Sequence, residues 1–279
     1  AAIGTLGQEP PRAFTALVET FGSLLANADE SSVDPASLSA VLGAVGDSAP
    51  GVVKPVLGTL VEQTDTSRPS LRNEAAWAVV RISTREPAML RPLIAGLVWD
   101  LEVDDPEVVQ RAAAMLGQIG RYLPNHLAGL DRLASLLDHP VSEVRAEAIE
   151  AFGKIAGTGS DPVTGTPDPE QVEPFLDAIA AQAGDQEPAV RAATIETLGQ
   201  VARHDRASAE AYASEFLRRA ADRDRAVQIA ALETLAQTFD ASIIDDDALW
   251  GYVVPQLTRK DDDVVAATVD VLLTAVRSL

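Results

Sequence analysis

A short apolar pattern recurs along the chain at nearly constant spacing, and this internal repeat restricts the fold more than any other feature. It is clearest in residues 106–119, 144–155 and 190–201, where an early valine is followed by alanines and then by Leu/Phe-Gly-x-Ile/Val. A repeat of this length indicates supersecondary units that bury their apolar faces against neighbouring units. The first apolar residue of each copy is its anchor, and the anchors are Leu71, Val108, Val144, Val190, Val227 and Val264, separated by 37, 36, 46, 37 and 37 residues.

Each copy of the pattern has the periodicity of an α-helix that buries one face. Small or apolar residues stand four, five, eight and eleven places after the anchor, as in Ala148, Ile149, Phe152 and Ile155. Residues spaced in this way lie along one side of a helix. A glycine follows the eighth place in three copies, at Gly117, Gly153 and Gly199, and predicts the close approach of a neighbouring helix.

A second amphipathic run precedes most of these helices, so each unit consists of a helix A, a turn and a helix B. The A runs cover residues 89–101, 123–137, 175–183, 211–221 and 249–257. Asp105-Pro106 and Glu187-Pro188 are typical starts of a B helix, with an acidic residue near the cap and proline at the first helical position. We therefore predict an all-α fold, a right-handed α-α superhelix (solenoid) of about seven two-helix repeats.

The expected boundaries make residues 1–279 a single solenoid. Residues 157–170 contain much Gly, Pro, Ser and Thr and are expected to form a surface loop between two repeats. The apolar end of the chain shows no polar capping repeat, which favours a longer natural chain or a larger complex. The repeats are expected at 10–46, 47–84, 85–121, 122–156, 168–204, 205–240 and 241–279, with residues 1–9 as the tail of an upstream repeat.

The B-helix pattern of Val-Arg, alanines and Leu-Gly-x-Ile resembles that of HEAT repeats, and the resemblance covers nearly the whole chain. Three prolines, each sixteen residues before an anchor, fit the helix A of the same family: Pro55, Pro92 and Pro174. Residues 75–78, Ala-Ala-Trp-Ala, are similar to an armadillo unit. A spacing of 37 residues leaves little room for the third helix of such a unit, so compact HEAT-like repeats are the better match.

The resemblance to HEAT repeats implies a ladder of ion pairs that links neighbouring units through a turn aspartate and a B-helix arginine. Asp185 and Arg191 match these positions, and two further pairs match them more loosely, namely Asp138 with Arg145 and Asp65 with Arg72. Other units have Val109, Gln228 or Val265 in place of the arginine. The resemblance therefore does not predict a ladder across those units.

The charge of the chain bears on its partners and its source. Acidic residues number 42 and basic residues 22, which gives a formal net charge of −20. Nucleic acid is not the expected partner, because affinity for phosphate comes from Lys and Arg. The acidity, together with the preference for arginine over lysine, resembles proteins of salt-loving archaea. A basic partner surface is the competing explanation of the charge.

The sequence is typical of a soluble cytoplasmic protein. It contains no cysteine, so disulfides and thiolate metal sites are excluded. Its apolar runs are shorter than the roughly 18 residues that a membrane span requires. We therefore expect no membrane span.

Residues with the chemistry of an active site are few and scattered. Three histidines, His126, His139 and His204, fall in different units, and none is followed by the glutamate found in metal-dependent hydroxylases of the HEAT family. The acidic triplets at 245–247 and 261–263 precede helices, where charge compensation at the helix N-terminus explains them without a cation. No phosphate-binding loop is present. We predict a chain that is not an enzyme, with no catalytic, cofactor-binding or metal-binding residues.

Two alternatives remain open in the sequence. One is a HEAT-like enzyme, either similar to bilin lyases or metal-dependent. The other is a HEAT protein that binds nucleic acid, as DNA glycosylases of this kind do. The densest basic cluster, Arg218-Arg219 with Arg223 and Arg225, is interrupted by acids, which disfavours the second alternative.

The exposed side of successive B helices carries a row of acids. Six places after the anchor the residues are Trp77, Ala114, Glu150, Glu196, Glu233 and Asp270. In a solenoid, residues at one register form a ridge on the inner, concave face. We predict a non-catalytic protein-protein interaction scaffold whose ridge docks an unidentified protein partner, with the acids setting electrostatic complementarity and Trp77 as an apolar anchor. Plain solvation of the acids and a core position for Trp77 are the alternatives.

Overall fold

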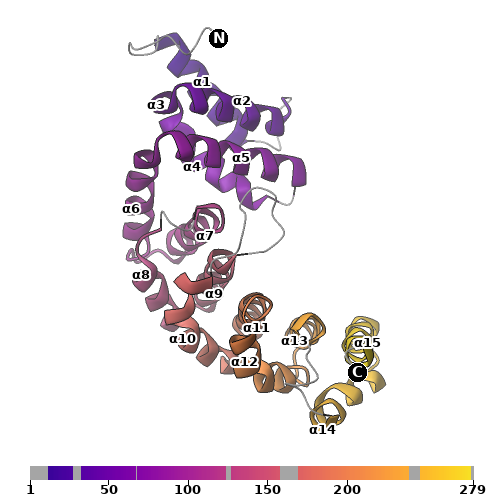
Figure 1. Cartoon of the computed structure of the whole chain (residues 1–279). Helices are drawn as coiled ribbons and strands as arrows, with labels where there is room; N and C mark the ends of the chain where they lie inside the picture. The colour runs from indigo at the N-terminus through magenta and orange to yellow at the C-terminus, as the bar shows by residue number, and fades with distance from the viewer. Residues whose placement is uncertain are drawn as a thin grey trace. The chain divides into compact units, whose positions relative to one another are not determined.

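The structure, a computed structural model, describes residues 12–27, 33–66, 68–123, 127–157, 169–238 and 246–277. These residues form helices joined by turns, with no strand among them (Figure 1). The predicted all-α solenoid is therefore confirmed. The chain divides into two compact units: described residues from 12–100 and 118–128 form the first, and those from 101–117 and 129–277 form the second.

The first unit contains helix pairs of the predicted kind. Helix α1 (Arg12–Ala26) precedes the B helix α2 (Pro35–Ser48), and α5 (Pro69–Arg85) is the next B helix. Helices α2 and α5 pack along one another. The helix A between them is broken into α3 (Pro50–Val53), the 3-10 turn η1 (Lys54–Val56), α4 (Leu57–Glu62) and the 3-10 turn η2 (Gln63–Asp65). After α5 come the 3-10 turn η3 (Pro87–Met89) and α6 (Leu90–Asp100).

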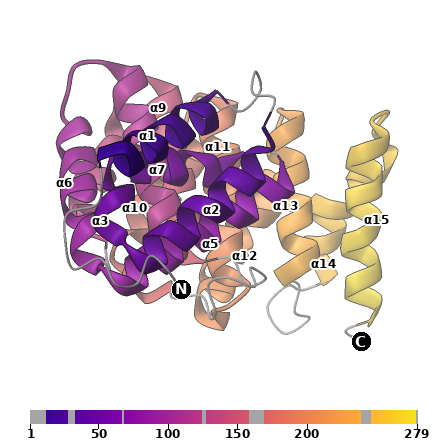
Figure 2. The ribbon, with the colours of Figure 1, turned by 90° about the horizontal axis from the view of Figure 1, so that it is seen from above.

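The second unit repeats the same plan along α9, α11, α13 and α15, its consecutive B helices. They cover Ser142–Ala156, Pro188–Ala202, Arg225–Thr238 and Asp262–Arg277, and each packs against the next (Figure 2). Helix α7 (Pro106–Tyr122) is also a B helix, and it contributes residues to both units.

Except for α12, the A helices of the second unit are short and end in 3-10 turns. The first is α8 (Leu130–Ser135) with η5 (Leu136–Asp138). The next comprises η6 (Pro169–Gln171), η7 (Glu173–Phe175), α10 (Leu176–Ala181) and η8 (Gln182–Gly184). The last two are α12 (Arg206–Arg219) and the run of α14 (Asp246–Ala248), the π-helical η9 (Leu249–Val253) and η10 (Val254–Thr258).

Prolines and glycines explain where helices A and B are interrupted. Pro55 lies inside η1, because proline has no N–H to continue the α-helical bonds. Within the run predicted over 123–137, residues 127–129 are not helical and α8 begins at Leu130, directly after Gly129, whose φ of 81° is left-handed. Helix α9 ends at Ala156, directly before Gly157, whose φ is 93°. The predicted loop at 157–170 lies mostly outside the described residues, and residues 169–170 of the loop belong to η6. The predicted tail at 1–9 also lies outside the described residues.

Close packing of the B helices depends on the glycine nine places after the anchor. A Cβ added to Gly117 would stand 2.8 Å from the Cα of Ala151 on α9. A Cβ added to Gly199 would stand 2.6 Å from the Oγ1 of Thr234 on α13. Both distances are shorter than real carbon contacts, so these helices approach as closely as the sequence predicts.

Candidate functional site

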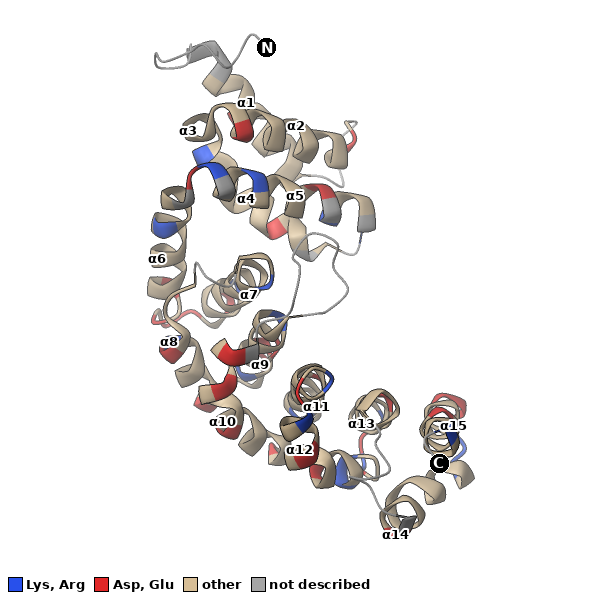
Figure 3. Ribbon diagram, viewed as in Figure 1, with Lys and Arg blue, Asp and Glu red and all other residues tan. Residues whose placement is uncertain are grey.

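The four acids of the predicted ridge are exposed on four consecutive B helices of the second unit. Glu150 is on α9, Glu196 on α11, Glu233 on α13 and Asp270 on α15, and we call these four residues the acidic row. Figure 1 shows the B helices on the inner side of this unit's curve and the A helices on its outer side. Figure 3 shows acidic residues, in red, on both the A and the B helices of this unit.

The two other residues of the predicted ridge have different surroundings. Ala114 on α7 is partly buried. Trp77 belongs to α5 of the first unit, where 45% of its surface is exposed. Trp77 is thus a surface residue of its unit rather than part of its core.

Electrostatic repulsion is present within the acidic row. Desolvation by the surrounding protein raises the pKa of Glu196, and the nearby carboxylate of Glu233 raises it further. The side chain of Glu196 is nevertheless solvent-exposed, which places it on a crowded surface rather than in the core. A group in this position favours a proton or another positive charge beside it.

A groove of about 730 Å³ lies between α13 and α15 at the end of the acidic row. Glu233, Asp263 and Asp270 line it, together with Gln237 and Arg225. The rest of the lining is apolar, with Ile229 and the small side chains of Ala236, Ala266 and Ala267. The groove combines carboxylates with apolar side chains, a lining suited to the stem and charged end of a long basic side chain.

Below the surface, arginines of the B helices link each repeat to the next. The guanidinium of Arg145 donates to both carboxylate oxygens of Asp185 at 2.9 Å. That of Arg191 donates to both oxygens of Asp222, at 3.1 and 2.8 Å. Both arginines also donate to backbone carbonyls of their own turn, Arg145 to His139 and Arg191 to Asp185. Each arginine therefore fixes its own turn and the turn that follows.

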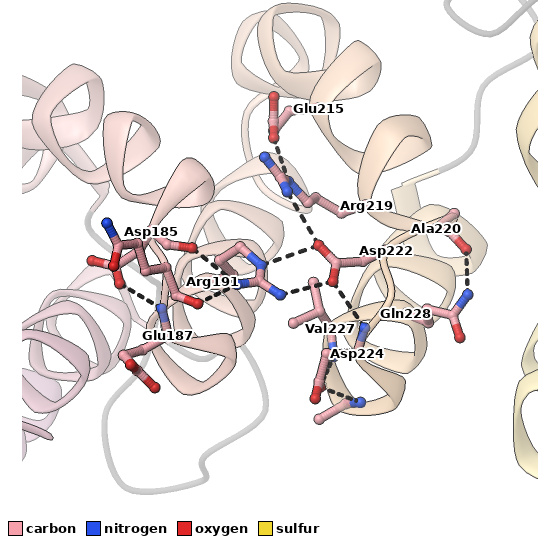
Figure 4. A network of polar contacts seen from close by, with 12 residues as sticks. Asp185, Glu187, Arg191, Glu215, Arg219, Ala220, Asp222, Asp224, Val227 and Gln228 are labelled. Atoms are coloured by element: carbon pink, nitrogen blue, oxygen red, sulfur yellow. Dashed lines mark hydrogen bonds and ion pairs between the residues drawn. The ribbon is translucent and has the colours of Figure 1, made fainter. Parts of the chain in front are cut away.

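Asp222 is the centre of the largest of these networks (Figure 4). Besides the two bonds from Arg191, it accepts a bond from Arg219 at 3.1 Å and from the backbone N–H of Asp224 at 3.0 Å. Arg219 is held in turn by Glu215 at 2.7 Å. Burial by itself would raise the pKa of Asp222, but these donors lower it to about 2.

The structure places the ladder residues differently from the sequence-based assignment in one respect. Asp138 is exposed and is not a ladder residue; His139 occupies the register position of Asp185, five places before the anchor. The Nδ1 of His139 accepts the backbone N–H of Val141 at 3.1 Å, just as Asp185 accepts that of Glu187 at 2.8 Å. Counting the register back from Val144 would have identified His139.

Sequence reasoning missed Asp222, the partner of Arg191, and one further rung at Arg225. Arg225 stands two places before its anchor, in a unit where Gln228 occupies the expected arginine position. It donates to Asp261 at 2.6 Å and also to Asp263. Both aspartates belong to the triplet that was weighed as a cation site, and Asp261 also accepts the backbone N–H groups of Asp263 and Val264. These carboxylates are engaged by Arg225 and by the start of α15.

Other candidate groups are dispersed. His204 lines a hollow of about 610 Å³ beside α10 and α12, with Asp177 and Tyr212, where burial and then the charge of Asp177 raise the pKa of Tyr212. His126 and Asp245 lie outside the described residues. Within the described part of the chain, no three His, Cys, Asp or Glu side chains are grouped so that they could hold a metal ion. No helix of that part has the length and apolar character needed to cross a membrane.

Comparisons with known proteins identify the fold. No family model matches the chain, and no curated protein matches it either. Among solved structures, an engineered protein is 19% identical with a TM-score of 0.51, over 98% of this chain and 72% of its own. The chain is a helical-repeat solenoid.

Two designed armadillo repeat proteins resemble the solenoid over a smaller part of it. One is 17% identical over 78% of this chain and 99% of its own, with a TM-score of 0.47. The other, in complex with the peptide (KR)4, is 18% identical over 79% of this chain and 99% of its own, with a TM-score of 0.45.

Proposed function

We propose that this chain is a non-catalytic, HEAT-like scaffold that binds a basic partner protein on the inner face of its second unit. The observation that carries the proposal is the acidic row: four exposed carboxylates at one register of four consecutive, packed helices. Carboxylates scattered for solubility have no reason to keep a common register. A common register presents a periodic charge to one extended partner.

The electrostatics of the row favour a cationic occupant. The raised pKa of Glu196 means that its negative charge is disfavoured where it stands, chiefly by desolvation and also by Glu233. A lysine or arginine placed between the two carboxylates would offset that repulsion. The groove between α13 and α15, on the other side of Glu233, offers a second cation apolar side chains for its methylene stem.

The spacing of the helices gives the partner a length scale. Packed helices stand roughly 8–10 Å apart, and an extended chain advances about 3.3 Å per residue. An extended segment that crosses the B helices therefore meets a new acid about every third residue. The partner segment we propose carries Lys or Arg at that interval.

Trp77 and the overall charge complete the proposal. With 45% of its surface exposed, Trp77 serves as a separate apolar contact on the first unit. Nucleic acid is not a partner, because a net charge of −20 repels phosphate. We place the protein in the cytoplasm of a salt-loving archaeon, where screening by salt makes such a charge tolerable.

Selection from a displayed peptide library tests the proposal. The native chain should enrich peptides with Lys or Arg about every third residue, and their affinity should fall as salt is added. The variant Glu150→Arg/Glu196→Arg/Glu233→Arg should lose these peptides. Circular dichroism establishes first that each variant is folded.

A matched control separates the effect of the acidic row on binding from the effect of net charge. The variant Asp131→Arg/Glu173→Arg/Asp177→Arg changes three exposed acids of the A helices in the same unit, with the same change of charge. It should retain the selected peptides. Equal loss in both variants, or selection of peptides without basic residues, would refute binding through the acidic row.

A further inference from the structure

The last B helix, α15, carries an apolar stripe along one face. Val265, Val269, Leu273 and Val276 follow one another at intervals of four, four and three residues, which aligns them on one face of the helix. Val269, Leu273 and Val276 are 40%, 46% and 68% exposed, and Val265 is partly buried. We call these four residues the terminal stripe. Figures 1 and 2 show α15 as the last helix of the second unit, with α13 beside it.

In the preceding B helices the same register is buried. Five places after the anchor stand Ile149, Ile195 and Leu232, each with 0% exposure, and the fourth member of this series is the exposed Val269. The described part of the second unit has six exposed large apolar side chains, and all belong to its last helix pair: Trp250, Tyr252, Leu257, Val269, Leu273 and Val276. The stripe is thus an unpartnered interface.

Leu273 stands at a register where the closely packed B helices have a small residue. Nine places after the anchor, α9 has Gly153, α11 has Gly199 and α13 has Ala236. Even a single Cβ at the two glycines would come within 2.7 and 2.6 Å of threonine side chains on the next helix. The larger side chain of Leu273 therefore favours an occupant that packs by interdigitating side chains at ordinary helix spacing.

We propose that the terminal stripe is a homodimer interface, in which α15 of two copies packs antiparallel across a two-fold axis. An uncharged, aliphatic stripe is complementary to itself, as a two-fold interface requires. The ends of α15 have opposite charge, with Asp262 and Asp263 at its start and Arg277 at its end. Antiparallel packing brings Arg277 of one copy towards the aspartates of the other, and also opposes the two helix dipoles.

Sedimentation velocity of the full chain over a range of concentrations tests the dimer. Each copy carries a net charge of −20, so the dimer should be weak in low salt and tighter in molar salt, where the mutual repulsion is screened. The Leu273→Glu/Val276→Glu variant should raise the dissociation constant by about a hundredfold or more, because each change buries an unpaired charge in the interface. Both positions are exposed in the single chain, so the fold should persist.

The control variant Leu17→Glu/Val41→Glu adds the same charge at positions of the first unit with 44% and 45% exposure. It should dimerise like the native chain. A native chain that stays monomeric in molar salt would overturn the proposal and leave the stripe to another occupant. A dimer that tolerates the stripe variant as well as the control would overturn it too.

Cross-linking tests the antiparallel arrangement, and the chain has no cysteine to interfere. A two-fold axis near the middle of the stripe sets Val269 of one copy opposite Leu273 of the other. A mixture of the Val269→Cys and Leu273→Cys variants should therefore form a disulfide-linked dimer under mild oxidation, and a mixture of Val269→Cys with Val41→Cys should not. Linkage of Leu273→Cys with itself but not with Val269→Cys would contradict the antiparallel arrangement.

Discussion

Asp222 is the residue on which the link between α11 and the last repeats most depends. Four donors from three residues meet at its two oxygens. Breaking a largely buried pair leaves the other charge unsatisfied. Asp222→Asn should therefore lower the free energy of unfolding by about 2–4 kcal/mol in chemical denaturation. Asp138→Asn, at an exposed aspartate outside the ladder, is the control and should have little effect.

The pKa of Asp222 also predicts a pH dependence. An aspartate with a pKa of 3.8 when unfolded and about 2 when folded stabilises the protein above the higher value. That contribution, about 2 kcal/mol, is lost as the pH falls from about 4 to about 2. Asp222→Asn should flatten this part of the stability profile. An unchanged profile would show that Asp222 titrates as it does in the unfolded chain.

Glu196 should contribute to the pH dependence of stability with the opposite sign. Its pKa is raised in the folded protein, so it opposes folding once the pH exceeds that pKa. Glu196→Gln should raise the melting temperature at neutral pH, and molar salt should shrink the gain because the repulsion from Glu233 is screened. A lower melting temperature in the variant would mean that Glu196 has a stabilising partner in the free protein. A binding surface kept at the expense of stability is common in functional sites.

At the scale of the helix, adding a methyl group to a glycine tests how closely neighbouring B helices approach at the position nine places after the anchor. Gly199→Ala should improve helix propensity by about 1 kcal/mol but force a clash with Thr234, for a net loss of about 1 kcal/mol in the free energy of unfolding. Combining it with Thr234→Ala should remove most of that loss. Gly96→Ala on α6, where no atom lies within 4 Å, should stabilise the protein instead. Equal effects at Gly96 and Gly199 would refute the close approach of α11 and α13.

The helices and their packing were largely predictable from the sequence, and the polar links only in part. The spacing of Val144, Val190 and Val227 determines which side of each B helix is buried, because the helical period leaves one solution. The ladder followed the register only where Arg145 and Arg191 occupy the usual position. Arg225 reaches Asp261 from another position, because its long side chain can span the distance from a neighbouring turn of the helix. Side-chain reach of this kind is not encoded in a repeat period.

For the whole molecule, the repeat period carries no information about the division into two compact units. Both units use the same helix pairs, and the pattern runs through α7, which contributes to both. Exposure of the acidic row followed from the same register as the core, because six places after the anchor is the side opposite the buried positions. The raised pKa of Glu196 could not be predicted from the register, since it depends on the atoms that surround the side chain. The charge of −20 sets the conditions for every binding experiment, which must include high salt.

A double-mutant cycle between the acidic row and a bound basic peptide tests the central claim most directly. A peptide selected by the native chain would be compared with one in which a basic residue is replaced by Gln, against the native chain and Glu196→Gln. If the basic residue meets Glu196, the two changes together should weaken binding by less than their sum, with a coupling of about 1 kcal/mol or more. Strict additivity for every pairing of a row acid with a basic residue would contradict binding through the acidic row.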